Sequence, residues 1–277
     1  MTEQQTKERR IETTGQITRA MKMMAASKLE KSKRSITLFK PYIETLTTLF
    51  SEALSLDQKN HPLLVKRSVK KTRLLFRSSD KGFCAGLNST LFTAIKKYYN
   101  QAIIEGKEVQ LLPIGKKGVA FLAKENIIYK RKELIYTADT TLPQTKEIGQ
   151  LALEAFLRGD CDEVVLAYQG SVTPTPEKVT FVSLLPLLVD SSAATPPAWI
   201  CEPDAAGMVA AIAPRMAYLR LYENLLAAEL AEHKVRMLTM HQASENAAKM
   251  VQGLRLDYHR ARQAAITQEL NEIIAHF

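Results

Sequence analysis

The last part of this sequence lacks the residues that normally end a helix. Residues 215–277 contain no proline and only one glycine, Gly253. Proline and glycine interrupt helices more strongly than other residues, so their scarcity predicts one very long helix. At a rise of about 1.5 Å per residue that helix would extend roughly 95 Å, which is more than a compact domain encloses. Such a helix needs a partner along its length.

The other end of the chain has the same deficit. Residues 2–40 contain no proline and one glycine, Gly15, and they are rich in helix-forming residues. A second terminal helix is therefore expected, and it is the first candidate partner. Its apolar stripe is formed by Ile11, Met21, Met24, Ile36, Phe39, Ile43, Leu46 and Phe50.

The C-terminal segment has a heptad repeat. Every seventh residue after Leu219 is apolar with one exception, in the row Leu226, His233, Met240, Ala247, Leu254 and Ala261. The same stripe also takes in Met250, Val251, Ala265, Leu270 and Ile273. A sustained heptad favours a coiled coil, and many seam positions are small residues or methionine, which allow close approach of two helices. A helix that faces the core of a bundle is the alternative interpretation.

Cysteine is scarce, and the chain has no metal-binding motif. Cys84, Cys161 and Cys201 are widely spaced with no C-x-x-C, which fits reduced structural thiols. The five histidines form no H-E-x-x-H motif. No metal site or other cofactor is therefore expected from these residues.

Long hydrophobic runs are also missing. The longest, at residues 184–189, is short and contains Pro186, so no transmembrane helix is expected. The N-terminal residues include Glu3, Glu8 and Glu12 and no apolar stretch, which argues against a signal peptide.

The net charge of +9 is unevenly distributed. Residues 1–40 carry ten Lys or Arg against four Glu. A basic helix is compatible with nucleic acid, an anionic membrane surface or an acidic protein lumen as its partner, or with a solvated face that has no partner. No nucleic-acid recognition motif accompanies the charge.

Between the terminal helices the hydrophobic period changes to that of an α/β domain with a largely parallel sheet. Strands are predicted at residues 72–78, 109–114, 163–169 and 178–185, and helices at 87–106, 116–126 and 142–158. The resulting domain boundaries are 1–55 for the N-terminal helix, 70–190 for the α/β domain and 204–277 for the C-terminal helix, with Asp204 as its N-cap.

The turn after the first strand, residues 78–88 (SSDKGFCAGLN), is the best candidate for an enzymatic site, because ligands bind at strand carboxyl ends in such sheets. It contains neither G-x-G-x-x-G nor G-K-[ST], and Cys84 has no histidine nearby in sequence. Gly82 and Gly86 are expected to shape a tight turn, with Asn88 near the cap of the next helix. A dinucleotide-dependent enzyme remains an alternative.

Three segments resemble the signatures of the gamma subunit of rotary F-type ATP synthases. They are residues 17–29 (ITRAMKMMAASKL), 78–88 and 260–270 (RARQAAITQEL), and Glu202-Pro203-Asp204 resembles a further landmark. The resemblance implies a central stalk without catalytic residues: an antiparallel coiled coil of the terminal helices, with a small Rossmann-like α/β domain beside it. A basic coiled-coil protein that binds nucleic acid is the alternative.

The resemblance also implies partners. The stalk would turn inside a hexamer of alpha and beta subunits, and its foot would dock on a membrane ring of c subunits beside epsilon, at the cytoplasmic face of a bacterial inner membrane. Contacts with the hexamer would be made by Met21, Lys22, Arg262, Gln263, Thr267 and Glu269. Glu202 and Asp204 would belong to the foot.

This chain departs from the family pattern at three positions. Gly15 replaces the usual glutamine, and Phe83 and Ala85 stand where leucine and glycine are common. A glycine inside a helix costs about 1 kcal/mol relative to alanine.

Overall fold

The computed structural model describes residues 3–56, 61–125, 127, 140–170, 179–188 and 204–275. It divides into two compact units. The helix-pair unit comprises Met1–Lys28 and Arg236–Phe277, and the sheet unit comprises Leu29–Val235. Two long helices, α1 (Glu3–Leu56) and α5 (Ala205–Ala275), contribute residues to both units.

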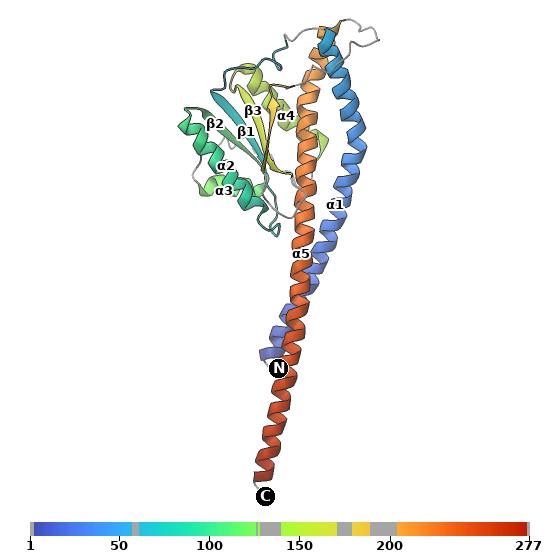
Figure 1. Ribbon diagram of the computed structural model, residues 1–277, viewed down its shortest axis with the longest axis vertical. Helices are drawn as coiled ribbons and strands as arrows, with labels where there is room; N and C mark the ends of the chain where they lie inside the picture. The colour runs from blue at the N-terminus through green and yellow to red at the C-terminus, as the bar shows by residue number, and fades with distance from the viewer. Residues whose placement is uncertain are drawn as a thin grey trace. The chain divides into compact units, whose positions relative to one another are not determined.

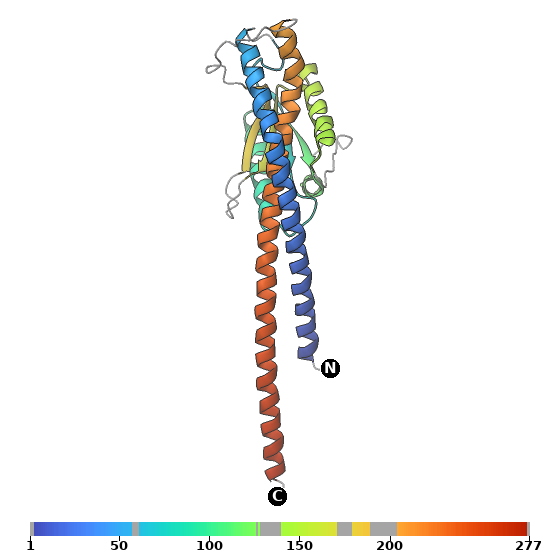
Figure 2. The same ribbon diagram turned by 90° about the vertical axis from the view of Figure 1, so that its right-hand side faces the viewer.

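In the helix-pair unit α1 and α5 run antiparallel (Figures 1 and 2). Three pairs of residues establish the direction, because the partner number on α5 falls as the number on α1 rises. Nε of Arg255 donates to Oε1 of Glu8 at 2.6 Å, and Nζ of Lys22 lies 3.1 Å from Nδ1 of His241. Between them, a Cβ atom built on Gly15 would lie 3.3 Å from Cβ of Ala247. The positions on α1 are seven residues apart, which is the repeat of a coiled coil.

The face of α1 that packs against α5 consists largely of small and polar residues; we call this face the seam. Thr18, Ala25 and Ser32, spaced by seven, are all buried. Two methionines assigned to the apolar stripes are instead on the surface: Met24 is 60% exposed and Met250 is 59% exposed. The stripe predictions are wrong at these two positions, because small side chains lie at the seam where the helices approach each other closely.

The sheet unit contains a four-stranded sheet of order β2-β1-β3-β4. The strands are β1 (Lys71–Arg77), β2 (Glu108–Ile114), β3 (Glu163–Gln169) and β4 (Val179–Leu185). β1 pairs in parallel with β2 and β3, whereas β4 is antiparallel to β3. The predicted largely parallel sheet is confirmed, and each predicted strand agrees with the structure to within a residue at either end.

Helices cover both faces of this sheet. On one face α2 (Leu87–Ile104) and α3 (Lys116–Lys124) enclose a core that includes Leu74 and Phe76. On the other face Leu75 packs in a larger core with α4 (Leu142–Arg158) and with the parts of α1 and α5 that belong to the unit. Alternate residues of β1 thus face opposite layers, as a strand requires. The predicted fold class, a long helix pair with a small α/β domain, is confirmed.

The C-terminal heptad row is buried over most of its length. Leu219, Leu226 and His233 are buried in the sheet unit, and Met240 and Ala247 are buried in the helix-pair unit. Further along, Leu254 is partly exposed and Ala261 is fully on the surface. Burial thus decreases toward the end of α5, although the heptad pattern continues.

Candidate functional site

The end of α5 has no companion helix from the described part of this chain. Extending the antiparallel register places Glu3, where α1 begins, opposite about residue 260 of α5. Beyond that point every side chain described, from Ala261 to Ile274, is exposed. Figures 1 and 2 show α5 continuing past the start of α1.

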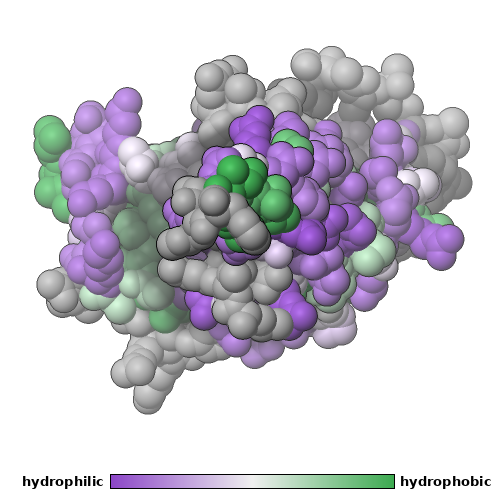
Figure 3. All heavy atoms as spheres, turned by 90° about the horizontal axis from the view of Figure 1, so that it is seen from below, coloured by the Kyte–Doolittle hydropathy of each residue, from purple (hydrophilic) through white to green (hydrophobic). Residues whose placement is uncertain are grey.

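Large apolar side chains lie on this unaccompanied end. The exposed fractions are 44% for Ile266, 54% for Leu270, 57% for Ile273 and 71% for Ile274. Figure 3, which looks at the structure from below, shows an apolar group at the tip, surrounded by hydrophilic surface. A single helix with this much exposed apolar surface indicates an interaction site.

Four of the predicted contact residues lie on the same end of α5. Arg262, Gln263, Thr267 and Glu269 are all exposed. The hydroxyl of Thr267 donates to the carbonyl oxygen of Gln263 at 2.9 Å, one helical turn earlier. The other three present their polar groups outward from a helix, so they are accessible to another chain.

The other two predicted contact residues, Met21 and Lys22, are only partly exposed. The amine of Lys22 contacts Nδ1 of His241, whose Nε2 lies 3.4 Å from Oε1 of Glu245. His241 and Glu245 were not among the predicted contact residues, because they are more than two hundred residues from Lys22 in the sequence. Pairing the apolar stripes of the two terminal helices in an antiparallel register would have placed His241 opposite Lys22.

A cavity of about 300 Å³ opens beside Gly15 in the helix-pair unit. Its lining combines apolar, small and charged side chains: Ile11, Glu12, Gly15, Gln16, Arg19, Ser244, Ala247, Ala248, Val251, Gln252 and Arg255.

Asp204 caps the start of α5. Its Oδ1 accepts a hydrogen bond from the backbone N–H of Gly207 at 2.7 Å, which confirms the predicted N-cap. Glu202, the other residue predicted for the foot, lies outside the described residues.

The loop of residues 78–88 uses its polar groups internally. Asn88 Oδ1 accepts from the N–H of Ser79 at 3.1 Å, and its amide donates to Ser79 Oγ at 2.7 Å. Asp80 Oδ1 accepts from the N–H of Lys116 at 2.9 Å, which ties the loop to the start of α3. A phosphate site uses free backbone N–H groups at such an edge. Those of Ser79 and Lys116 are occupied by these hydrogen bonds.

The loop ends at the start of α2, as expected. The N-cap residue is Gly86, without a side-chain cap, and Asn88, two residues later, lies near the cap and bonds back to Ser79. The left-handed conformations belong to Phe83 (φ 63°) and Ala85 (φ 47°), and not to the glycines on either side. The loop thus places two residues with side chains where glycine is favoured.

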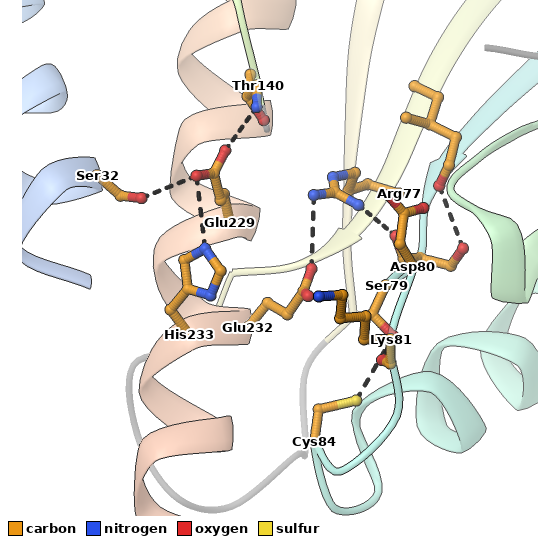
Figure 4. Close-up of polar contacts among 12 residues, drawn as sticks. Ser32, Arg77, Ser79, Asp80, Lys81, Cys84, Thr140, Glu229, Glu232 and His233 are labelled. Carbon is orange, nitrogen blue, oxygen red and sulfur yellow. Dashed lines mark hydrogen bonds and ion pairs between the residues drawn. The ribbon is translucent and has the colours of Figure 1, made fainter. Parts of the chain in front are cut away.

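Buried charges lie where the sheet meets α5 (Figure 4). Nη2 of Arg77, at the end of β1, is 3.5 Å from Oε2 of Glu232. One turn earlier, Glu229 accepts hydrogen bonds from Ser32 Oγ at 3.0 Å and from the N–H of Thr140 at 2.9 Å. Burial would raise the pKa of Glu229, but hydrogen bonds from His233, Thr140 and Ser32 outweigh it and lower the pKa to about 2.

Two further features bear on the class of protein. Among the described residues no group of three or more His, Cys, Asp or Glu side chains could hold a metal ion. No helix within the described ranges is long and apolar enough to cross a membrane.

Comparison with known proteins identifies the family. A family model described as ATP synthase matches residues 1–277. The ATP synthase gamma chain of Trichlorobacter lovleyi is 33% identical over 272 residues, which cover 96% of this chain and 93% of that one. The gamma chain of an Exiguobacterium species is 34% identical over 264 residues, covering 95% and 93%. The chain belongs to the ATP synthase gamma chain family.

Solved structures agree at the level of the fold. The rotor of the Euglena gracilis mitochondrial ATP synthase aligns with a TM-score of 0.63 at 16% identity, covering 95% of this chain and 97% of that one. The central stalk of the Tetrahymena thermophila enzyme aligns with a TM-score of 0.58 at 22% identity, covering 82% and 99%. The predicted function, a non-catalytic central-stalk or rotor subunit of ATP synthase, is confirmed at the level of the gamma chain family.

Proposed function

We propose that this gamma chain turns inside a hexamer of alternating alpha and beta subunits and forces each beta subunit through its binding states. Residues 1–55 and 204–277 would be the shaft, and residues 70–190 the body beside it. The observation that carries the proposal is the end of α5, where Ile266, Leu270 and Ile273 are exposed and no other described helix of this chain runs beside them. A socket formed by other subunits would cover them.

The polar contacts with the hexamer would come from two places. Arg262, Gln263, Thr267 and Glu269 are exposed on the unaccompanied end, where they can donate and accept hydrogen bonds across an interface. Met21 and Lys22 would contact the hexamer further along the shaft. Because the contact of Lys22 with His241 holds its amine on the shaft, a partner carboxylate would meet a positioned charge and not a freely moving one.

The foot would lie where α1 ends and α5 begins. In the sheet unit the rings of Phe39 and Tyr222 are 4.7 Å apart, so the antiparallel register continues and brings Leu56 toward the start of α5. Asp204, at that start, would dock with Glu202 on a ring of c subunits and on epsilon. The chain would then be peripheral to the membrane, held through the complex at the cytoplasmic face of a bacterial inner membrane.

The coupling of rotation to the binding states of the beta subunits would depend on the asymmetry of the shaft. A ligand shifts a conformational equilibrium only through different interactions with its two states. A shaft whose sides carry different residues contacts three equivalent beta subunits differently at any moment, and rotation exchanges those contacts. The chemistry of ATP would remain in the beta subunits, and this chain would only shift the equilibrium among their binding states.

Affinity purification of the tagged chain from its native membranes tests the proposal. The eluate should hydrolyse ATP and contain alpha and beta in threefold excess over this chain. Replacement of both Arg262 and Gln263 by alanine should lower coupled ATP turnover and leave the amount of chain in the assembly unchanged. Recovery of the chain alone, or with nucleic acid, from membranes whose synthase is intact without it would refute the role.

A further inference from the structure

Two carboxylates are buried one turn apart on α5, at the place where the apolar core of the sheet unit gives way to polar contacts. Glu229 is 7% exposed and Glu232 is 8% exposed. Below them on α5 the buried residues are apolar, including Leu221, Leu225 and Ala228. Charged side chains are rarely buried to this degree unless they are paired.

Glu232 joins α5 to the sheet. Its partner, Arg77, is the last residue of β1, and both side chains are 10% exposed or less. Nη1 of Arg77 also donates to the carbonyl oxygen of Ser78, so the guanidinium spans from the strand end to the helix. Within the described residues its Nε has no hydrogen-bond partner. A buried ion pair of this kind contributes little net stability, because desolvation offsets the attraction.

Glu229 joins α5 to two other segments. One oxygen accepts from Ser32 on α1, and the other accepts from the backbone of Thr140, which precedes α4 (Figure 4). His233, one turn further along α5, lies 3.6 Å from the same carboxylate. The helix thus holds α1 and the approach to α4 through Glu229, and the end of β1 through Glu232.

These contacts allow only one alignment of the sheet against α5. One turn before Glu232 lies Glu229, whose oxygens already accept hydrogen bonds from Ser32 and Thr140, and one turn after it lies the buried Arg236. A slip of the sheet by one turn would therefore bring Arg77 either to a carboxylate that is already hydrogen-bonded or against a like charge. Apolar contacts are less directional than this ion pair, so they specify the alignment less strictly.

We propose that Arg77 and Glu232, supported by Glu229, fix the sheet in a single register to the part of α5 that belongs to the same unit, so that the sheet turns together with that part of the helix. This inference rests on the proposed rotor function. It assigns the pair a positioning role in coupling and gives it no role in ATP chemistry. The pair retains charge in the core because charge specifies the register, even though an apolar pair would pack at least as stably.

The test compares coupling with stability in the whole synthase. Vesicles containing the purified complex would be supplied with ATP, and hydrolysis would be measured together with cation pumping, the latter by a voltage-sensitive dye. Arg77→Met and Glu232→Met each break the buried ion pair, and each should lower pumping per ATP hydrolysed to about half or less. Arg77→Lys keeps the charge and should restore most of the ratio.

The double variant Arg77→Met/Glu232→Met decides between positioning and simple stabilisation. It removes both buried charges, so the chain should unfold at a temperature equal to or above that of the wild type. We expect the double variant to pump as few cations per ATP hydrolysed as the single variants, because no charge remains to fix the register. A ratio restored together with stability would overturn the proposal.

Arg158→Met is the matched control, since it removes an exposed arginine that pairs with Glu154 and Asp160 on the same sheet unit. Its pumping ratio should equal that of the wild type. If all the Arg77 and Glu232 variants pumped as many cations per ATP as the wild type, the proposed role of this pair would be wrong. The rotor function would still stand. A complex that lacks this chain and still pumps as many cations per ATP hydrolysed would instead overturn the rotor function itself.

Discussion

Nζ of Lys22 lies 3.1 Å from Nδ1 of His241, across the antiparallel pair formed by α1 and α5. Both side chains are partly exposed, so the contact stabilises the pair by less than about 1 kcal/mol. Its larger effect is on the lysine, because a bound amine reacts more slowly with acylating reagents than a free one.

His241→Leu removes the acceptor, and Lys22 should then be acetylated faster in the isolated chain. Mass spectrometry of a timed reaction measures the rate at each lysine. Lys33, which pairs with Glu30 on the surface of α1, is the internal control and should keep its rate. An unchanged rate at Lys22 would mean that the contact does not persist in solution.

Ala85 is a site where a smaller side chain should stabilise the fold. Its φ of 47° lies in the left-handed region, which costs a residue with a Cβ atom about 1–2 kcal/mol. Ala85→Gly should therefore raise the free energy of unfolding by about 1 kcal/mol, after allowance for the extra freedom of glycine in the unfolded chain. Chemical denaturation of the purified chain measures the change.

Ala120→Gly, in the interior of α3, is the opposite control and should lower the free energy of unfolding by about 1 kcal/mol. If both substitutions destabilise the chain, the left-handed conformation at Ala85 is not present in solution.

Gly15 and Gly253 should respond differently to alanine. Both lie in helices, where alanine is favoured by about 1 kcal/mol. A Cβ atom at Gly253 meets nothing within 4 Å, whereas one at Gly15 approaches Ala247 Cβ to 3.3 Å. Gly253→Ala should therefore give the full gain and Gly15→Ala a smaller one, measured by thermal unfolding. An equal gain at both sites would contradict the close approach of the helices at Gly15.

Glu229 should make stability depend on pH at the acid end. Its pKa in the folded chain is about 2, below the ordinary value of 4.5, so the carboxylate stabilises the fold above about pH 4.5. That contribution, on the order of 3 kcal/mol, should disappear as the pH falls toward 2. Glu229→Gln should therefore cost most at neutral pH and almost nothing near pH 2, when denaturation curves are compared across that range.

Glu223 provides a control of opposite sign. Burial raises its pKa, the nearby Glu44 adds to the rise, and Arg220 opposes it, so its charged form is disfavoured by folding. Glu223→Gln should stabilise the chain at neutral pH and lose that advantage as the pH falls. A cost at neutral pH for Glu223→Gln would contradict the assignment.

The exposed end of α5 should matter to assembly and not to the folding of this chain. Leu270→Ser, Ile273→Ser and Ile274→Ser combined should change the free energy of unfolding by no more than about 0.5 kcal/mol, because these side chains are already in solvent. The same variant should recover less alpha and beta subunit in affinity purification. Ile104→Ser, at a site 79% exposed on α2, should leave recovery unchanged. Full recovery with the triple variant would exclude this end from the interface.

The secondary structure could be predicted closely from the sequence because the signals were local. The run Glu163–Gln169 is apolar and bounded by polar residues, and it is a strand over the same residues in the structure. The boundaries of α4, Leu142 and Arg158, follow from Pro143 near its start and Gly159 at its end, where φ is 80°. No long-range information was needed for either element.

The polar contacts could not be predicted in the same way. Arg77 ends an apolar strand and would ordinarily reach solvent, but the structure buries it against Glu232, far along the chain. Thr18 and Ser32 are buried between α1 and α5 but were absent from the predicted stripe, because that stripe consisted of apolar residues only. In each case the partner is distant in sequence, and only the three-dimensional register brings the two together.

Direct observation of rotation tests the central claim. A cysteine placed at the exposed Lys97 of α2 would carry a bead, while the alpha and beta subunits of the purified synthase are fixed to a surface. With ATP we expect stepwise rotation in one direction, with three steps per turn for a hexamer with three catalytic subunits. A bead that stays still on complexes that hydrolyse ATP at the normal rate would contradict it.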